Sequence, residues 1–156
     1  LKSRFVLSDF AGCTGVFNRK LLEETIIFKP NYMLMHDTWI LRICICLGGK
    51  VVIDSEPHMN YRQHIGNAVG LKHGMLATFK QVRQYIYEYQ IERLTKELLL
   101  GYENKMLPEY REVANWICNY KIDKEARKKL LDKKNIDFCN KGLNLTYKLK
   151  VMMRKL

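Results

Sequence analysis

Residues 35–64 read MHDTWILRICICLGGKVVIDSEPHMNYRQH and hold the densest polar chemistry of the chain, set around apolar segments. Asp37 opens the stretch, an apolar run and a β-prone run follow, and Arg62 and His64 close it. A carboxylate, a guanidinium and an imidazole gathered around apolar elements are typical of a functional site. We therefore expect the rest of the fold to be organised around this stretch.

The apolar run after Asp37 predicts a helix. Between positions 38 and 47 apolar residues recur three and four residues apart and also fill the other side, so the helix should be buried nearly all round. Gly48 and Gly49 predict its C-terminal end. Asp37 stands at its N-terminal end, where a carboxylate accepts backbone N–H bonds, so helix capping is one explanation of this residue.

Two β-prone regions lie on either side of that helix in the sequence. Residues 5–17 are punctuated by Gly12 and Gly15, which indicates a bulge, a close approach of backbone to a ligand, or a simple turn between strands. Residues 51–54 predict a buried strand, and residues 58–62 a second extended run. The sequence therefore predicts a fold of the α/β class, or an α+β fragment.

Further helices are predicted before and after this core. The signals are local N-caps, a proline suited to a first helical turn, and apolar residues at helical spacing. They place helices at 19–25 behind Asn18, at 75–101, from Pro108 onward, at 124–133 behind Asp123, and in the basic amphipathic stretch 143–156.

Composition bounds the class of protein. With 156 residues, 47% of them hydrophobic, one globular domain with a real core is expected. The longest apolar run, 43–49, is far shorter than the roughly twenty residues needed to cross a bilayer. Five cysteines without a CxxC pair favour free thiols and make a zinc site improbable.

The net charge of +11 is concentrated at the C-terminal end. Residues 121–156 carry twelve Lys or Arg against four Asp or Glu, a net of +8. This predicts contact with an anionic surface. The basic amphipathic stretch 143–156 suits the interface of an anionic membrane, or its apolar stripe docks on the preceding helices; the two are compatible.

Four motifs in order resemble one enzyme family. They are GCTGVFNR at 12–19, HDTW at 36–39, GKVVID at 49–54, and YRQH at 61–64 followed by Gly66-Asn67. Together they resemble the C-terminal half of a family 2 glycosyltransferase of the GT-A fold, especially the bacterial rhamnosyltransferase-like group acting on surface polysaccharides. The resemblance covers residues 10–70. It implies that 1–73 form the acceptor and catalytic half of a GT-A domain and that 74–156 form a helical C-terminal extension.

The resemblance also implies a role for each motif residue. Asp37 would be the general base that takes the proton of the acceptor hydroxyl as its oxygen attacks the anomeric carbon, with inversion of configuration. His36 beside it would shape the pocket. The donor-binding residues implied are Gly12, Cys13 and Thr14 on the sugar-binding floor, with Arg62 and His64 facing the donor diphosphate and His64 also facing its metal ion.

Cofactor, substrates and location follow from the same resemblance. The full-length enzyme would use a divalent metal, Mg²⁺ or Mn²⁺, a nucleotide-sugar donor, and a glycan or lipid-linked acceptor in the cytoplasm, with peripheral contact at the inner face of the cell membrane. The DxD-type metal motif of such enzymes does not occur in this sequence; Asp54-Ser55-Glu56 is the nearest approach. Because the chain opens on Leu1 without a signal pattern, we expect a piece of a longer protein. The resemblance implies that this piece is inactive alone, because the nucleotide-binding half of the enzyme is missing.

Two other classes of function remain open. A basic helical module that binds nucleic acid or an acidic protein partner would explain the charged tail. Nucleic acid is not expected as a partner, because the tail lacks regular aromatic interleaving and no nucleic-acid motif appears. A helical protein interaction domain would make Asp37 and His64 purely structural. Trp39 either stacks on a sugar or packs in the core.

Overall fold

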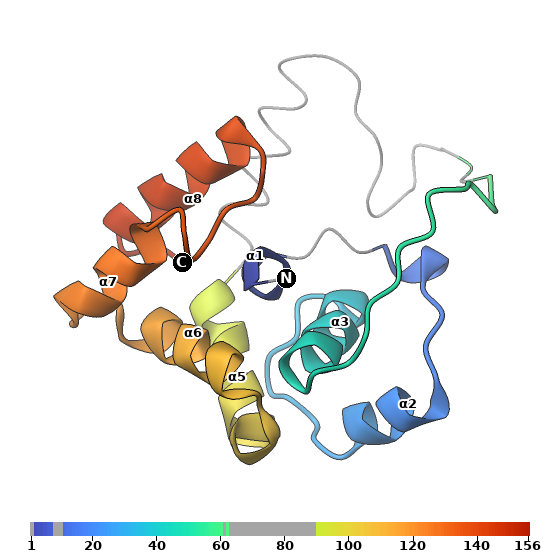
Figure 1. The fold of residues 1–156 in the computed structure, drawn as a ribbon. Helices are drawn as coiled ribbons and strands as arrows, with labels where there is room; N and C mark the ends of the chain where they lie inside the picture. The colour runs from blue at the N-terminus through green and yellow to red at the C-terminus, as the bar shows by residue number, and fades with distance from the viewer. Residues whose placement is uncertain (1, 8–10, 61, 63–89) are drawn as a thin grey trace. The chain divides into compact units, whose positions relative to one another are not determined.

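The structure is a computed structural model that describes residues 2–7, 11–60, 62 and 90–156 (Figure 1). The chain forms two compact units. One comprises Leu1–Val51 and Gln90–Leu156, and the other comprises Val52–Tyr89. The predicted boundary between residues 73 and 74 lies outside the described residues.

The first unit is built from helices. These are α1 (Lys2–Val6), the 3₁₀ turn η1 (Gly12–Thr14), α2 (Arg19–Ile26), α3 (His36–Cys46), α5 (Ile91–Tyr102), the 3₁₀ turn η2 (Glu103–Lys105), α6 (Pro108–Asn119), α7 (Lys124–Leu131) and α8 (Lys141–Met152). The second unit is inserted in the sequence between α3 and α5. No strand occurs in the part of the chain that the structure describes. The prediction of an α/β or α+β fold, and with it a GT-A architecture, is therefore wrong for these residues.

The predicted strand at 51–54 has no regular structure. Val52 and Ile53 are 75% and 65% exposed, although the sequence suggested burial. A strand is stable only when its N–H and C=O groups pair with a neighbouring strand, and no described segment offers one. The extended run at 58–62 likewise forms no strand over its described residues.

The β-prone region at 5–17 also takes another form. Phe5 and Val6 lie in α1 and are completely buried, and the glycine-punctuated part forms the turn η1. A preference for strands reports mainly how well a side chain fits a half-buried surface, and these two side chains find that burial from a helix.

Four local signals at helix ends were predicted correctly. The Asn18 side-chain oxygen accepts the Leu21 N–H at 2.9 Å, and Asp123 accepts the Glu125 N–H at 2.8 Å. Pro108 occupies the first turn of α6. Gly48, with φ of +79°, ends α3 in the left-handed region, where a side chain would be strained. The predicted helix at 75–101 can be followed only over α5, since residues 75–89 lie outside the described part.

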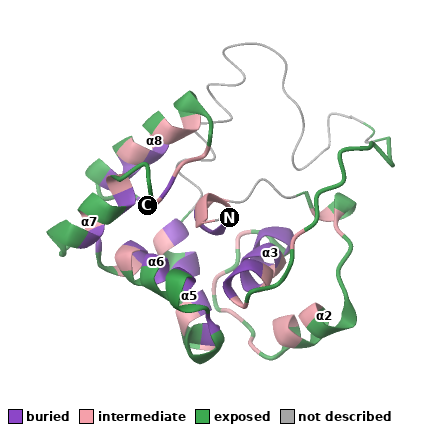
Figure 2. Cartoon of the chain, viewed as in Figure 1, coloured by how far each residue is buried: buried purple, intermediate pink, exposed green. Residues whose placement is uncertain are grey.

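Helix α3 is the most deeply buried element of the first unit (Figure 2). Eight of its eleven residues are buried, as the apolar spacing predicted. Trp39, 3% exposed, packs with Phe28 and Tyr102 at ring-centroid distances of 6.4 and 6.2 Å. Core packing is therefore the role that the structure gives this tryptophan. The sequence reading did not single out Arg42, which is completely buried and donates to the Val6 carbonyl.

Helices α6, α7 and α8 pack in sequence order. Val151 and Tyr147 of α8 are buried, and Tyr147 stacks edge-on against Phe138 with ring centroids 5.2 Å apart. The Tyr120 hydroxyl, at the end of α6, accepts the Leu156 N–H at 2.8 Å. The expectation that the C-terminal stretch docks on preceding helices is confirmed.

Two buried tyrosines on this side of the unit provide a matched test. The Tyr120 hydroxyl has the Leu156 N–H as a partner, whereas the buried Tyr147 hydroxyl has none among the described residues. Tyr120→Phe should lower the free energy of unfolding by about 1 kcal/mol because a buried N–H loses its acceptor. Tyr147→Phe should leave the free energy of unfolding unchanged or raise it. Urea unfolding followed by circular dichroism measures both; equal losses would contradict the assignment.

A second test concerns the contact between α5 and the segment after α2. A Cβ atom at Gly101 would lie 2.6 Å from the Phe28 ring, so Gly101→Ala should lower the free energy of unfolding by about 1–3 kcal/mol. Gly142 in α8 is the control, because an added Cβ would meet nothing nearer than 3.4 Å. Gly142→Ala should leave stability unchanged or raise it by up to about 1 kcal/mol. A tolerated Gly101→Ala would show that Phe28 does not pack there.

Candidate functional site

The candidate site is centred on Asp37 in the first turn of α3. Its side chain is 4% exposed, and both carboxylate oxygens accept backbone N–H groups. Oδ2 accepts from Gly12 at 2.9 Å and Oδ1 from Thr38 at 2.7 Å. The helix begins two residues earlier than predicted, so Asp37 lies inside its first turn, and Met35 is the capping position.

The turn η1 lies directly against this carboxylate. Two hydrogen bonds stabilise the turn: the Gly15 N–H donates to the Gly12 carbonyl at 3.2 Å, and the Thr14 hydroxyl donates to the Ala11 carbonyl at 2.7 Å. A Cβ atom at Gly12 would lie 2.9 Å from the Asp37 Cβ and 3.3 Å from His36 Nε2. Glycine is favoured at position 12 because a side chain there would clash with Asp37 and crowd His36.

The structure thus brings together two motifs that lie apart in sequence. Gly12 touches both His36 and Asp37, and Cys13 and Thr14 follow it in the same turn. Cys13, Thr14 and His36 are exposed, whereas Asp37 is buried. The arrangement places a carboxylate just beneath a surface that carries a thiol, a hydroxyl and an imidazole. Chemically it can anchor the turn, and it can accept a proton where a hydroxyl reaches it.

Of the other two predicted donor-binding residues, Arg62 is exposed and belongs to the second unit, and His64 lies outside the described residues. Within the second unit His58 Nε2 lies 2.9 Å from Asp54 Oδ2, with both side chains well exposed. The backbone N–H of Glu56, and then the His58 ring, lower the pKa of Asp54.

The described residues offer no ready metal site. Among them no group of three or more His, Cys, Asp or Glu side chains is placed to hold an ion, and the pair of Asp54 and His58 is too few. His64, the predicted metal contact, falls outside that search. Within the same described residues, no helix has the length and apolarity to cross a membrane.

The bond between Gly12 and Asp37 was not predicted. The sequence suggested Asp37 as a cap of its own helix, and there its Oδ1 accepts the Thr38 N–H. It suggested for Gly12 a bulge, a close approach to a ligand or a simple turn, whereas the Gly12 N–H donates to the other oxygen of Asp37. The residues are 25 positions apart, so no local spacing signals the pair. The only available signal was the joint occurrence of the GCTG and HDTW motifs.

Comparisons with known proteins add no relative. No family model, no curated protein and no solved structure matches this chain.

The close approach at Gly12 yields a prediction. Gly12→Ala should lower the free energy of unfolding by about 1–3 kcal/mol, because the new methyl group displaces η1 from the buried carboxylate. Cys13→Ala, at the exposed neighbouring position, should leave stability within about 0.5 kcal/mol of the original. Thermal and urea unfolding measure both variants. If alanine is accommodated at position 12 without loss, the turn does not lie on Asp37.

Proposed function

We propose that this chain supplies the acceptor side of an inverting glycosyltransferase, with Asp37 as its general base. The observation that carries the proposal is the contact of the GCTG turn with the His36-Asp37 pair, which joins two of the motifs that resemble the family. The proposal rests on this site and on the order of the motifs. The α/β architecture is no part of it.

The proposed chemistry requires little of Asp37 beyond position and charge. The acceptor hydroxyl would donate a hydrogen bond to the carboxylate and lose its proton as its oxygen attacks the anomeric carbon. The leaving group is a nucleoside diphosphate on the opposite face, which gives inversion. Each carboxylate oxygen has a second lone pair beyond the one that its backbone N–H uses, so an acceptor position remains.

Burial of Asp37 sets a condition on this chemistry. Asp37 is 4% exposed, so a hydroxyl reaches its carboxylate only when a group packed on it, such as η1, moves aside. Exclusion of water then strengthens the interactions of the carboxylate with its donors. Gly12, Cys13 and Thr14 would form the floor under the sugar, where small side chains leave room.

The remaining elements of the proposal come from the resemblance alone. Arg62 and His64 would offset the charge of the departing diphosphate. A divalent ion, Mg²⁺ or Mn²⁺, would neutralise the same charge when bound. The acceptor would be a glycan or lipid-linked intermediate of a bacterial surface polysaccharide, and the reaction would take place in the cytoplasm at the inner face of the membrane.

One observation favours a second candidate function. Both oxygens of Asp37 already hold backbone N–H groups, which is what a carboxylate with a purely structural role would do. On this alternative the chain is a helical protein interaction domain, and Asp37 only ties η1 to α3. The two candidate functions differ in the effect expected when Asp37 is replaced by a neutral residue of the same shape.

Asp37→Asn in the longer protein that the resemblance implies separates the two. An asparagine oxygen can still accept one N–H but cannot take a proton, so sugar transfer should fall by about 10²–10⁴-fold while the fold and donor binding survive. Transfer is measured with radiolabelled nucleotide sugar, folding by circular dichroism, and donor binding by calorimetry.

The matched control is Asp123→Asn. Asp123 also accepts a backbone N–H at a helix start, but it caps α7, away from the site. This control should transfer sugar at the original rate. Unimpaired turnover of Asp37→Asn would remove the general-base role and leave the structural one.

A further inference from the structure

Helix α8 has two apolar faces, and only one of them is covered. Tyr147 and Val151 face the protein and are 5% and 0% exposed. Leu145, Leu149 and Met152 are 61%, 49% and 65% exposed. The second set recurs at i, i+4 and i+7, so these side chains form one stripe on the side of the helix opposite to the buried face.

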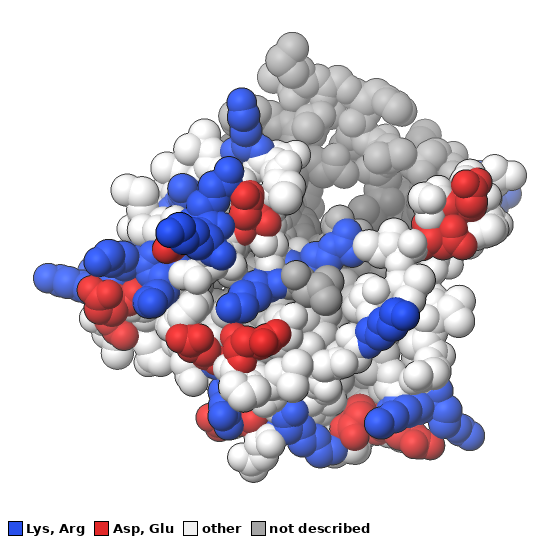
Figure 3. Space-filling model, in the orientation of Figure 1, with Lys and Arg blue, Asp and Glu red and all other residues white. Residues whose placement is uncertain are grey.

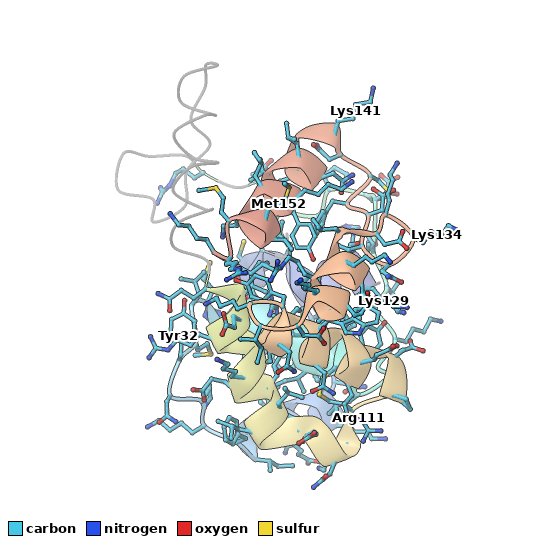
Figure 4. The ribbon with its side chains drawn as sticks, turned by 90° about the vertical axis from the view of Figure 1, so that its left-hand side faces the viewer. Tyr32, Arg111, Lys129, Lys134, Lys141 and Met152 are labelled. Atoms are coloured by element: carbon cyan, nitrogen blue, oxygen red, sulfur yellow. The ribbon has the colours of Figure 1, made fainter. Side chains whose placement is uncertain are left out.

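Cations outnumber carboxylates around this stripe. Residues 138–156 contain five Lys or Arg and no Asp or Glu, and the carboxylate of Asp137 just before them is paired with Lys133 and accepts from Asn144. Lys150 points inward, and burial lowers its pKa to about 8. Lys141, Arg154 and Lys155 are exposed, and Lys148 is partly exposed. Figure 3 shows Lys and Arg side chains gathering over α7 and α8 on the face in view, and Figure 4 shows Lys141 extending outward from the first turn of α8, with Met152 at its other end.

We propose that α8 lies in the plane of an anionic membrane surface, with Leu145, Leu149 and Met152 inserted at the level of the acyl chains and the flanking cations on the lipid headgroups. An exposed apolar stripe bordered by cations is the pattern of interfacial helices. At twelve residues the helix is too short to span a bilayer but long enough to lie on one.

The same observations favour lipid over other anionic partners. Nucleic acid is bound through hydrogen-bond donors and aromatic platforms, whereas the exposed stripe consists of leucine and methionine. An acidic protein partner would account for the cations. It would not explain the three exposed apolar side chains. Insertion into a lipid interface accounts for both features.

This inference is independent of the proposed transferase activity. Helix α8 contributes no residue to the cluster around Asp37 and Gly12. A chain without catalytic function could still bind membranes, and the converse also holds. Success or failure of the vesicle experiment is therefore separate from the outcome of Asp37→Asn.

The test is flotation of the 156-residue chain with lipid vesicles. The chain should partition onto vesicles of 70% phosphatidylcholine and 30% phosphatidylglycerol, and at least about tenfold less onto pure phosphatidylcholine. The triple variant Leu145→Ser, Leu149→Ser, Met152→Ser should lose at least about tenfold in partitioning to anionic vesicles. The double variant Lys141→Gln, Lys148→Gln should partition severalfold less to anionic vesicles, and this difference from the original chain should shrink at high salt.

The matched control replaces three exposed apolar residues elsewhere in the same unit. Ile26, Leu100 and Ile122 are 73%, 72% and 86% exposed, and their joint replacement by Ser should not change partitioning. Circular dichroism verifies that each variant is folded. The proposal is overturned if the α8 triple variant binds as the original does, if the control loses as much, or if the chain binds poly(A) RNA tightly while ignoring anionic vesicles.

Discussion

Burial of α3 is the constraint on which the first unit depends. Helices α1 and α2 and the turn η1 all pack against it, and the Leu107 N–H at the start of α6 donates to the Cys46 carbonyl at its end, at 2.8 Å. An eleven-residue helix buried on most sides can be stable only if its few polar groups find partners. Arg42 finds its partner as a hydrogen-bond donor, and Asp37 finds its partners as an acceptor. The guanidinium of Arg42 donates to the carbonyl of Val6, and the carboxylate of Asp37 accepts the N–H of Gly12.

The candidate site is a consequence of that requirement. A carboxylate in the first turn of a buried helix needs donors, and the nearest are backbone N–H groups of its own helix and of a turn that carries no side chain at the point of contact. The same placement that stabilises the fold puts a buried carboxylate close to an exposed histidine. The stability of the fold and the proposed chemistry therefore depend on one set of contacts, which is why an isosteric change at position 37 is more informative than a truncation.

The sequence predicted well those features that are encoded within a few residues. The caps at Asn18 and Asp123, the proline that opens α6 and the glycine that ends α3 are local, and all four occur. The predicted strands were wrong because a strand depends on a partner that is distant in sequence. Propensity for β-structure reveals neither that Phe5 and Val6 are buried in a helix nor that Val52 and Ile53 are exposed. The hydrogen bond from Gly12 to Asp37 escaped prediction for the same reason, although the residues themselves were singled out.

Helix α8 shows how two alternatives drawn from one pattern can be compatible. Its apolar residues looked like a single stripe that would either dock on the protein or meet a membrane. The structure divides them between two faces, since Tyr147 and Val151 pack inward while Leu145, Leu149 and Met152 remain exposed. A helix held by one face is already ordered, so binding through its other face would not have to offset the entropy of folding it. A modest exposed stripe with a few cations can then suffice for reversible attachment.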